Sequence, residues 1–242
     1  MAFEIIICEN YRDLSQRAAR IAIEAIPPDR DSLISFPGGD TPLGMIEEIT
    51  RILNNGEACI SRTRYVSLDE WVGLGPDDEG SCAWFNRTKL LEKLNQPFLE
   101  TFILNGQAED PQAECERLNA FIDRWGPLDL SVLGIGLNGH IGFNEENVDV
   151  KLKAHVIPLS ETTKSVMNKY FSKAYDLQYG MTQGLHQIMA AKRVILIASG
   201  KHKASILQRA LRGKVDPSVP ASILQKHPGL IVVADKEAAS AL

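Results

Sequence analysis

The stretch Asp129-Leu-Ser-Val-Leu-Gly-Ile135 is almost entirely apolar, and so is Val194-Ile-Leu-Ile-Ala198 further along the chain. A strand with one face in water alternates apolar and polar residues, whereas continuous apolar runs are typical of strands that helices cover on both faces. Helical patterns fill most of the gaps between these two strands and five further predicted strands, at residues 3–8, 32–36, 64–68, 102–104 and 230–234. This order predicts an α/β fold, a single-domain, doubly wound, mostly parallel and Rossmann-like sheet with helices on both faces.

Two segments add detail to this expectation. Thr41 has the chemistry of a helix N-cap, and Pro42 would then take the first helical position, where its missing N–H costs nothing. Residues His155 to Gly180 interrupt the alternation of strands and helices with a polar helical pattern. We therefore expect one domain over residues 1–242, with a helical lid at about 155–180.

The composition argues against several classes of function. The chain has 242 residues and a formal net charge of -5, with no block of basic residues that would bind nucleic acid. No stretch approaches the roughly 20 apolar residues of a membrane span. The four cysteines show neither CxxC nor a metal-ligand spacing, which fits reduced thiols. We expect a soluble, cytoplasmic protein that needs no metal and no cofactor and binds neither nucleic acid nor membrane.

Ligands of open parallel sheets bind beyond the carboxyl ends of the strands, so the loops that follow the strands are where chemistry is expected. In Phe36-Pro-Gly-Gly-Asp-Thr-Pro-Leu-Gly44, Gly38 and Gly39 allow close approach of a ligand to the backbone. The free N–H groups of the following helix and the Thr41 hydroxyl would suit a phosphate. A tight turn with a good cap explains the same residues equally well. The loop lacks GxxxxGK[ST] and GxGxxG, so no nucleotide site is indicated.

Adjacent carboxylates follow another strand in Val66-Ser-Leu-Asp-Glu-Trp-Val-Gly73. At such a place one carboxylate, here Asp69, can enter the cleft as a proton shuttle while its neighbour Glu70 turns away. A solvated or capping pair of acids is the alternative interpretation.

The most informative segment is Leu133-Gly-Ile-Gly-Leu-Asn-Gly-His-Ile-Gly-Phe-Asn-Glu145, a glycine-rich bend after a buried strand. It places His140 close to Asn138 and Glu145. A carboxylate near an imidazole fixes its tautomer and tunes it as an acid or base near neutral pH. This density of polar groups after an apolar strand predicts an active site.

Lys203 opens a helix after the apolar run at 194–198. A lysine in the first turn opposes the helix dipole, so an anion such as phosphate would compensate it, and a solvated surface lysine is the alternative. Taken together, the four loops predict proton-transfer chemistry on a phosphorylated small molecule.

The chain resembles the glucosamine-6-phosphate deaminases and their galactosamine-6-phosphate relatives through SLDEWVGL, LGIGLNGHIGFNE and VPASILQKH, which occur in matching order across nearly the whole chain. The resemblance implies that Asp69 moves a proton between C2 and C1 of the opened sugar and that His140 helps to open the ring. Glu145 would orient His140. Asn138 stands where the family often has Asp, and we expect it to hold His140 by hydrogen bonding.

The resemblance also implies a set of residues that grip the 6-phosphate. Lys169, in the expected lid, stands where an arginine is familiar and would supply a point charge. Asp40 stands where a small residue is usual, and its charge would oppose a phosphate unless its side chain points away or caps the helix. The phosphate-binding residues implied in this way are Gly38, Gly39, Thr41, Lys203 and Lys169.

Two other functions stay open at this stage. The 6-phosphogluconolactonases share the superfamily, and in a lactonase His140 would activate water against a sugar lactone. A non-catalytic sugar-phosphate-binding regulator is the second alternative. The choice between glucosamine and galactosamine epimers and the choice between a monomer and a homo-oligomer stay open as well. The basic residues that regulated relatives carry before the lid are not evident, so we expect no activation by an N-acetylated sugar phosphate.

Overall fold

The computed structural model describes residues 3–167, 171 and 175–242. Its large sheet has seven strands, and every neighbouring pair in it is parallel. This confirms the predicted parallel sheet, and each of the seven predicted strands overlaps one observed strand, although the prediction at 102–104 shares only Phe102 with it. In spatial order the strands are β1 (Glu4–Cys8), β10 (Leu230–Asp235), β9 (Arg193–Ala198), β6 (Leu130–Leu133), β2 (Ser32–Ser35), β3 (Thr63–Val66) and β5 (Glu100–Phe102).

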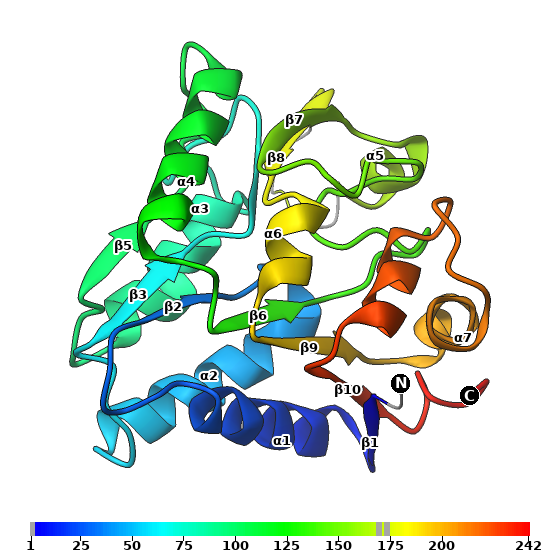
Figure 1. Ribbon diagram of the computed structural model, residues 1–242, viewed down its shortest axis with the longest axis horizontal. Coiled ribbons are helices and arrows are strands. Elements are labelled where there is room, and N and C mark those ends of the chain that lie inside the picture. The colour runs from blue at the N-terminus through cyan, green and yellow to red at the C-terminus, as the bar shows by residue number, and fades with distance from the viewer. Residues whose placement is uncertain (1–2, 168–170, 172–174) are drawn as a thin grey trace.

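Helices cover both faces of this sheet (Figure 1). Helices α1 (Tyr11–Glu24) and α2 (Asp40–Asn54) pack on one face, and α4 (Pro111–Trp125), α6 (Leu185–Ala190) and α7 (Ala204–Arg212) pack on the other. Strand β9 shows why its sequence is apolar throughout, because Ile195 and Ile197 enter the core under α1 and α2 while Val194 and Leu196 enter the opposite core.

The start of α2 differs from the expected start. The helix begins at Asp40 with Gly39 as its N-cap, so Thr41 lies inside the first turn and is not the cap. Gly39 has a φ of 105°, a conformation that residues with side chains rarely adopt. The turn is therefore set by this glycine, and the backbone N–H groups of the first turn face the end of β2.

A second sheet was not expected from the sequence. Strands β4 (Asp69–Trp71), β8 (Tyr179–Thr182) and β7 (His155–Pro158) form a three-stranded antiparallel sheet. The segment 155–180, predicted as a helical lid, thus begins and ends in strands, with helix α5 (Glu161–Met167) between them. Figure 1 shows β7, β8 and α5 grouped apart from the large sheet.

The remaining elements are short. Helix α3 (Cys82–Phe85) continues into a π-helical turn at Asn86–Leu90 and a 3-10 turn at Leu91–Lys93. Two further 3-10 segments, Lys201–Lys203 and Pro220–Lys226, stand before and after α7. The first of these leads from β9 directly into the candidate site.

Candidate active site

One cavity of about 410 Å³ lies beyond the carboxyl ends of the parallel strands. Its walls come from the loops after β2, β3, β6 and β9, together with helices α3 and α5. This is the edge at which open parallel sheets bind ligands. The sequence-predicted residues that line it are Gly38, Gly39, Thr41, Asp69, His140 and Lys203.

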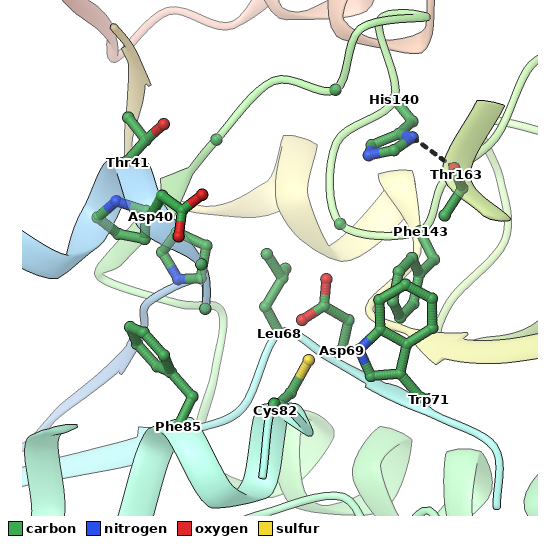
Figure 2. A pocket seen from close by; sticks show the side chains of 18 of the residues that line it. Asp40, Thr41, Leu68, Asp69, Trp71, Cys82, Phe85, His140, Phe143 and Thr163 are labelled. Atoms are coloured by element: carbon green, nitrogen blue, oxygen red, sulfur yellow. Dashed lines mark hydrogen bonds between the residues drawn. The ribbon is translucent and has the colours of Figure 1, made fainter. Parts of the chain in front are cut away.

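Asp69 and Glu70 point in different directions because they are neighbours on strand β4. Asp69 lines the cavity (Figure 2), whereas Glu70 is fully buried. The Glu70 carboxylate accepts hydrogen bonds from the backbone N–H groups of Trp71 (2.8 Å), Cys82 (3.0 Å) and Ala83 (2.6 Å). Glu70 therefore fixes the start of α3 against β4, and the two acids face different sides of the strand, as expected.

Apolar side chains surround the Asp69 carboxyl. Leu68, Trp71 and Phe143 are buried and stand around it in Figure 2, with the Cys82 thiol beside it. Burial raises the pKa of Asp69 to about 6, although a hydrogen bond with the Cys82 thiol and the charge of His140 both lower it. The carboxyl can therefore exchange a proton close to neutral pH.

The loop after β6 leaves room for the imidazole of His140 by using glycine at 136. A Cβ built on Gly136 would lie 2.4 Å from Nε2 of His140, which is closer than any real contact. The loop is closed by hydrogen bonds from the Gly136 N–H to the His140 carbonyl oxygen (2.9 Å) and from the Gly139 N–H to the Gly136 carbonyl oxygen (3.0 Å). The ring thus packs against its own loop and faces the cavity.

A buried hydrogen-bond network lies behind His140. Its Nδ1 is 3.2 Å from the hydroxyl of Thr163 (Figure 2). The same Nδ1 is 3.5 Å from Oε2 of Glu145, and the Thr163 hydroxyl donates to Glu145. The side-chain amide of Asn138 donates to Glu145 at 2.8 Å, and its oxygen accepts the backbone N–H of His140 at 3.2 Å. Asn138 therefore holds His140 by hydrogen bonding, as expected.

These donors keep Glu145 ionised. Burial alone raises the pKa of Glu145, but the hydrogen bonds and charge of His140, together with the hydrogen bonds from Thr163 and Asn138, outweigh it and lower the pKa to about 2. An ionised carboxylate is thus held beside the imidazole at every pH at which the protein is expected to work. Its position orients Nδ1 and leaves Nε2 toward the cavity side.

The other end of the cavity is suited to an anion. Gly38, Gly39 and Thr41 present the N-terminus of α2 there, and Figure 2 shows Thr41 across the cavity from His140. Lys203 reaches the same cavity and donates from Nζ to the carbonyl oxygen of Ile135 at 2.6 Å.

Two further side chains belong to this end. His202 lines it beside Lys203, and so does Asp40, whose carboxylate faces the cavity (Figure 2). Asp40 does not point away, so its charge is part of the environment that any bound anion meets. Lys169, the remaining predicted phosphate ligand, lies outside the described residues.

Comparison with known proteins identifies the family of the chain. The family model for glucosamine-6-phosphate isomerases/6-phosphogluconolactonase matches residues 9–233. The chain belongs to this family. Among its relatives is a glucosamine-6-phosphate deaminase of Thermoanaerobacter pseudethanolicus, 37% identical over 98% of this chain and 94% of the relative. A glucosamine-6-phosphate deaminase of Clostridium botulinum is 36% identical over 98% of both chains.

Solved structures of the family show the same fold. A monomeric glucosamine-6-phosphate deaminase superposes with a TM-score of 0.93 at 33% identity, covering 99% of this chain and all of the other. The 6-phosphogluconolactonase of Trypanosoma brucei gives a TM-score of 0.75 at 20% identity, covering 100% of this chain and 99% of the other. At 20% identity, the second comparison shows a similar fold and nothing more.

Three further residues lie at the site, although they were not among the predicted site residues. Thr163 contacts both His140 and Glu145, and Cys82 and His202 line the cavity. The position of Thr163 depends on how α5 packs, which no local sequence pattern predicts. His202 could have been predicted, because it stands next to Lys203 in a loop that was expected to carry chemistry. In the described parts of the chain, no three His, Cys, Asp or Glu side chains gather as metal ligands, and no helix is long and apolar enough to cross a membrane.

Proposed function

We propose that this protein isomerises and deaminates glucosamine 6-phosphate, giving fructose 6-phosphate and ammonia. The observation that carries the proposal is that Asp69 and His140 face one cavity whose other end is formed by the N-terminus of α2 and Lys203. A carboxyl and an imidazole at one end suit proton transfer, and the helix N-terminus with a lysine suits a phosphate. The names of the two bacterial relatives support the same activity.

His140 would act first, on the closed sugar. Its imidazole would exchange a proton with the ring oxygen and the hydroxyl at C1, so that the ring opens to the aldehyde. Glu145, Asn138 and Thr163 hold the ring in place for this step and do not themselves need to touch the sugar.

Asp69 would act next, on the open chain. Its ionised carboxylate would take the proton from C2 and return it to C1, while one proton of the C2 ammonium group moves to O1, so that the aldehyde at C1 becomes an alcohol and the ammonium at C2 becomes an iminium. Water then adds to C2 and ammonia leaves, so that the balance is glucosamine 6-phosphate plus water to fructose 6-phosphate plus ammonia.

The phosphate would be bound at the opposite end of the cavity by Gly38, Gly39, Thr41 and Lys203. Backbone N–H groups and a lysine ammonium provide donors to phosphate oxygens, and the helix dipole adds to the attraction.

We also propose Lys169 as a phosphate ligand from the lid. We place the protein in the cytoplasm, and the four free cysteines support this location. The lid is the segment at about 155–180, because its helix α5 brings Thr163 to the wall of the cavity.

The test is an assay for ammonia and for fructose 6-phosphate with glucosamine 6-phosphate as substrate, run beside galactosamine 6-phosphate and 6-phosphogluconolactone. We expect ammonia and ketose in equal amounts from the glucosamine substrate. Hydrolysis of the lactone without ammonia release would make the protein a lactonase instead. Binding of the sugar phosphates without turnover of any of the three would make it a regulator.

A further inference from the structure

Gln183 connects three segments of the active-site edge, although it is fully buried and cannot touch a substrate itself. It follows strand β8 directly. Its backbone N–H donates to the carbonyl oxygen of Leu68 at 2.8 Å, and its side-chain amide donates to the carbonyl oxygen of Ser67 at 2.9 Å and to the hydroxyl of Ser35 at 3.0 Å. Its own carbonyl oxygen accepts a hydrogen bond from the side chain of Asn144 at 2.8 Å.

Each of these partners stands next to a functional part of the cavity. Ser35 ends β2, just before the loop with Gly38 and Gly39. Ser67 and Leu68 lie between β3 and Asp69. Asn144 precedes Glu145 and also donates to the carbonyl oxygen of Ile141 at 2.9 Å, so it fixes the loop of His140.

Gln183 provides hydrogen-bond donors to two backbone carbonyl groups at the point where the chain leaves the large sheet. Strand β3 ends at Val66, and the chain then leaves the large sheet to join the small one at Asp69. The carbonyl groups of Ser67 and Leu68 lie at this crossing in the interior and need partners. The Gln183 amide and N–H supply them, which fixes the direction in which the chain enters β4.

We propose that Gln183 is a positioning residue for the reaction, holding the strand of Asp69 at a fixed distance from the loop of His140. The inference rests on the proposed function. Because proton transfer requires both groups to meet one sugar, a displacement of about 1 Å between them would slow the reaction on the order of 100-fold. Ser35 also stays paired with Ser131 of β6 in the large sheet. The α2 N-terminus and Lys203, on which phosphate binding mainly depends, should therefore be affected much less.

Gln187 provides a matched control, since it is a second buried glutamine only four residues away. Its side chain accepts the backbone N–H of Gly184 at 3.2 Å and donates to Asn119 of α4 at 3.0 Å. These bonds tie α6 to α4 and not to the cavity. Gln183→Met and Gln187→Met each keep an unbranched side chain of similar length and each remove the hydrogen bonds of one buried amide.

A second variant tests the hydrogen bond itself. Gln183→Glu introduces a carboxyl of the same shape among uncharged partners, Ser35 and Ser67, and burial will raise the pKa of that carboxyl. In its protonated form it can still donate one hydrogen bond, and in its ionised form it can donate none. The kcat of Gln183→Glu, divided by that of the wild type, should therefore fall as the pH rises from about 5 to about 8.

The experiment measures kcat and KM of the wild type and the three variants, with hydrogen exchange of the peptides covering 67–71 and 141–145. For Gln183→Met we expect kcat to fall about 10- to 100-fold with KM within about threefold of the wild type. Exchange should become faster in the peptide 67–71, because the side-chain bond to the Ser67 carbonyl oxygen is lost, whereas the peptide 141–145 should change less, because Asn144 bonds the backbone carbonyl oxygen of residue 183, which the variant keeps. Gln187→Met should retain kcat within about threefold and leave both peptides protected.

Three results would overturn the inference. The first is equal loss of kcat in the two methionine variants. The second is an unchanged exchange rate of the peptide 67–71 in Gln183→Met, and the third is a ratio for Gln183→Glu that does not change with pH. A wild-type protein without turnover would reject the proposed function alone, because the exchange measurement would still decide whether Gln183 holds the two segments together.

Discussion

The two ends of the cavity are built in different ways. At the proton-transfer end, side chains hold other side chains, since three side-chain donors and the backbone N–H of Ser160 fix Glu145, and apolar groups enclose Asp69. At the opposite end, where we propose that the phosphate binds, the backbone of α2 and Lys203 line the cavity. The first end depends on side-chain geometry and on pKa values, whereas the second depends on charge and on free N–H groups. Substitutions at the two ends should therefore affect different kinetic constants.

The largest effect is expected at the proton-transfer end. Asp69→Asn removes the carboxylate that accepts the proton, so kcat should fall by about 1,000-fold while KM stays within about threefold of the wild type.

The same variant should also change the stability of the fold. Burial raises the pKa of Asp69 in the folded protein to about 6 from the ordinary 3.8, so folding is progressively disfavoured as the pH rises between those two values. The neutral Asn removes this loss, and the variant should melt at a higher temperature than the wild type above pH 6. Unchanged kcat in a folded variant would show that another group is the base.

The next effect is expected at the anion end. Lys203→Ala removes a charged donor to the phosphate, a loss of about 2 kcal/mol or about 30-fold, which should appear in KM with kcat nearly unchanged. Lys201→Ala is the matched control, because this lysine is exposed and lies two residues away. If both variants gave the wild-type KM, the phosphate would have to bind elsewhere.

A smaller effect follows from the pKa of Asp69. Because the carboxylate must be ionised to accept a proton, kcat should rise about tenfold between pH 5 and pH 7, with a midpoint near 6. Saturating substrate keeps the titration of the phosphate from affecting this measurement. Cys82→Ala removes a hydrogen bond that lowers the pKa of Asp69, so its midpoint should lie at a higher pH, while Cys82→Ser should keep the wild-type midpoint. A midpoint that does not move in Cys82→Ala would contradict the role of the thiol.

The smallest effect is expected behind His140. Thr163→Val keeps the shape of the side chain but removes its hydrogen bonds to His140 and Glu145, at a cost of about 1 kcal/mol. We expect kcat to fall about fivefold without a change in KM. Ser165→Ala, on the exposed side of the same helix, should have no effect on either constant. Equal kinetics for the two variants would mean that α5 does not contribute to tuning the imidazole.

The two sheets differ in how much of them could be predicted. The inner strands of the large sheet, such as β6 and β9, are buried on both faces, so runs such as 194–198 were sufficient to locate them. Strands β4, β7 and β8 have only three or four residues each, and Asp69 pairs with Thr182, which is distant in the sequence. No local pattern encodes such a pairing, and the polar residues between β7 and β8 therefore suggested a purely helical segment.

The candidate site likewise contains residues that the sequence predicted and residues that only the structure revealed. Gly38, Gly39, Asp69, His140 and Lys203 stand directly after predicted strands, and the rule for parallel sheets was enough to bring them to one edge. Thr163 and Gln183 act through contacts made only when the small sheet packs against the large one. Their roles could be inferred only from coordinates.

The close packing of Gly136 against His140 also offers a way to sort related chains. Any side chain at position 136 would occupy the space of the imidazole, so a homologue with alanine or a larger residue there would have to displace its histidine. Inspection of this one position in a set of genome sequences would thus separate copies that can retain the catalytic geometry from copies that have lost it, before any protein is purified.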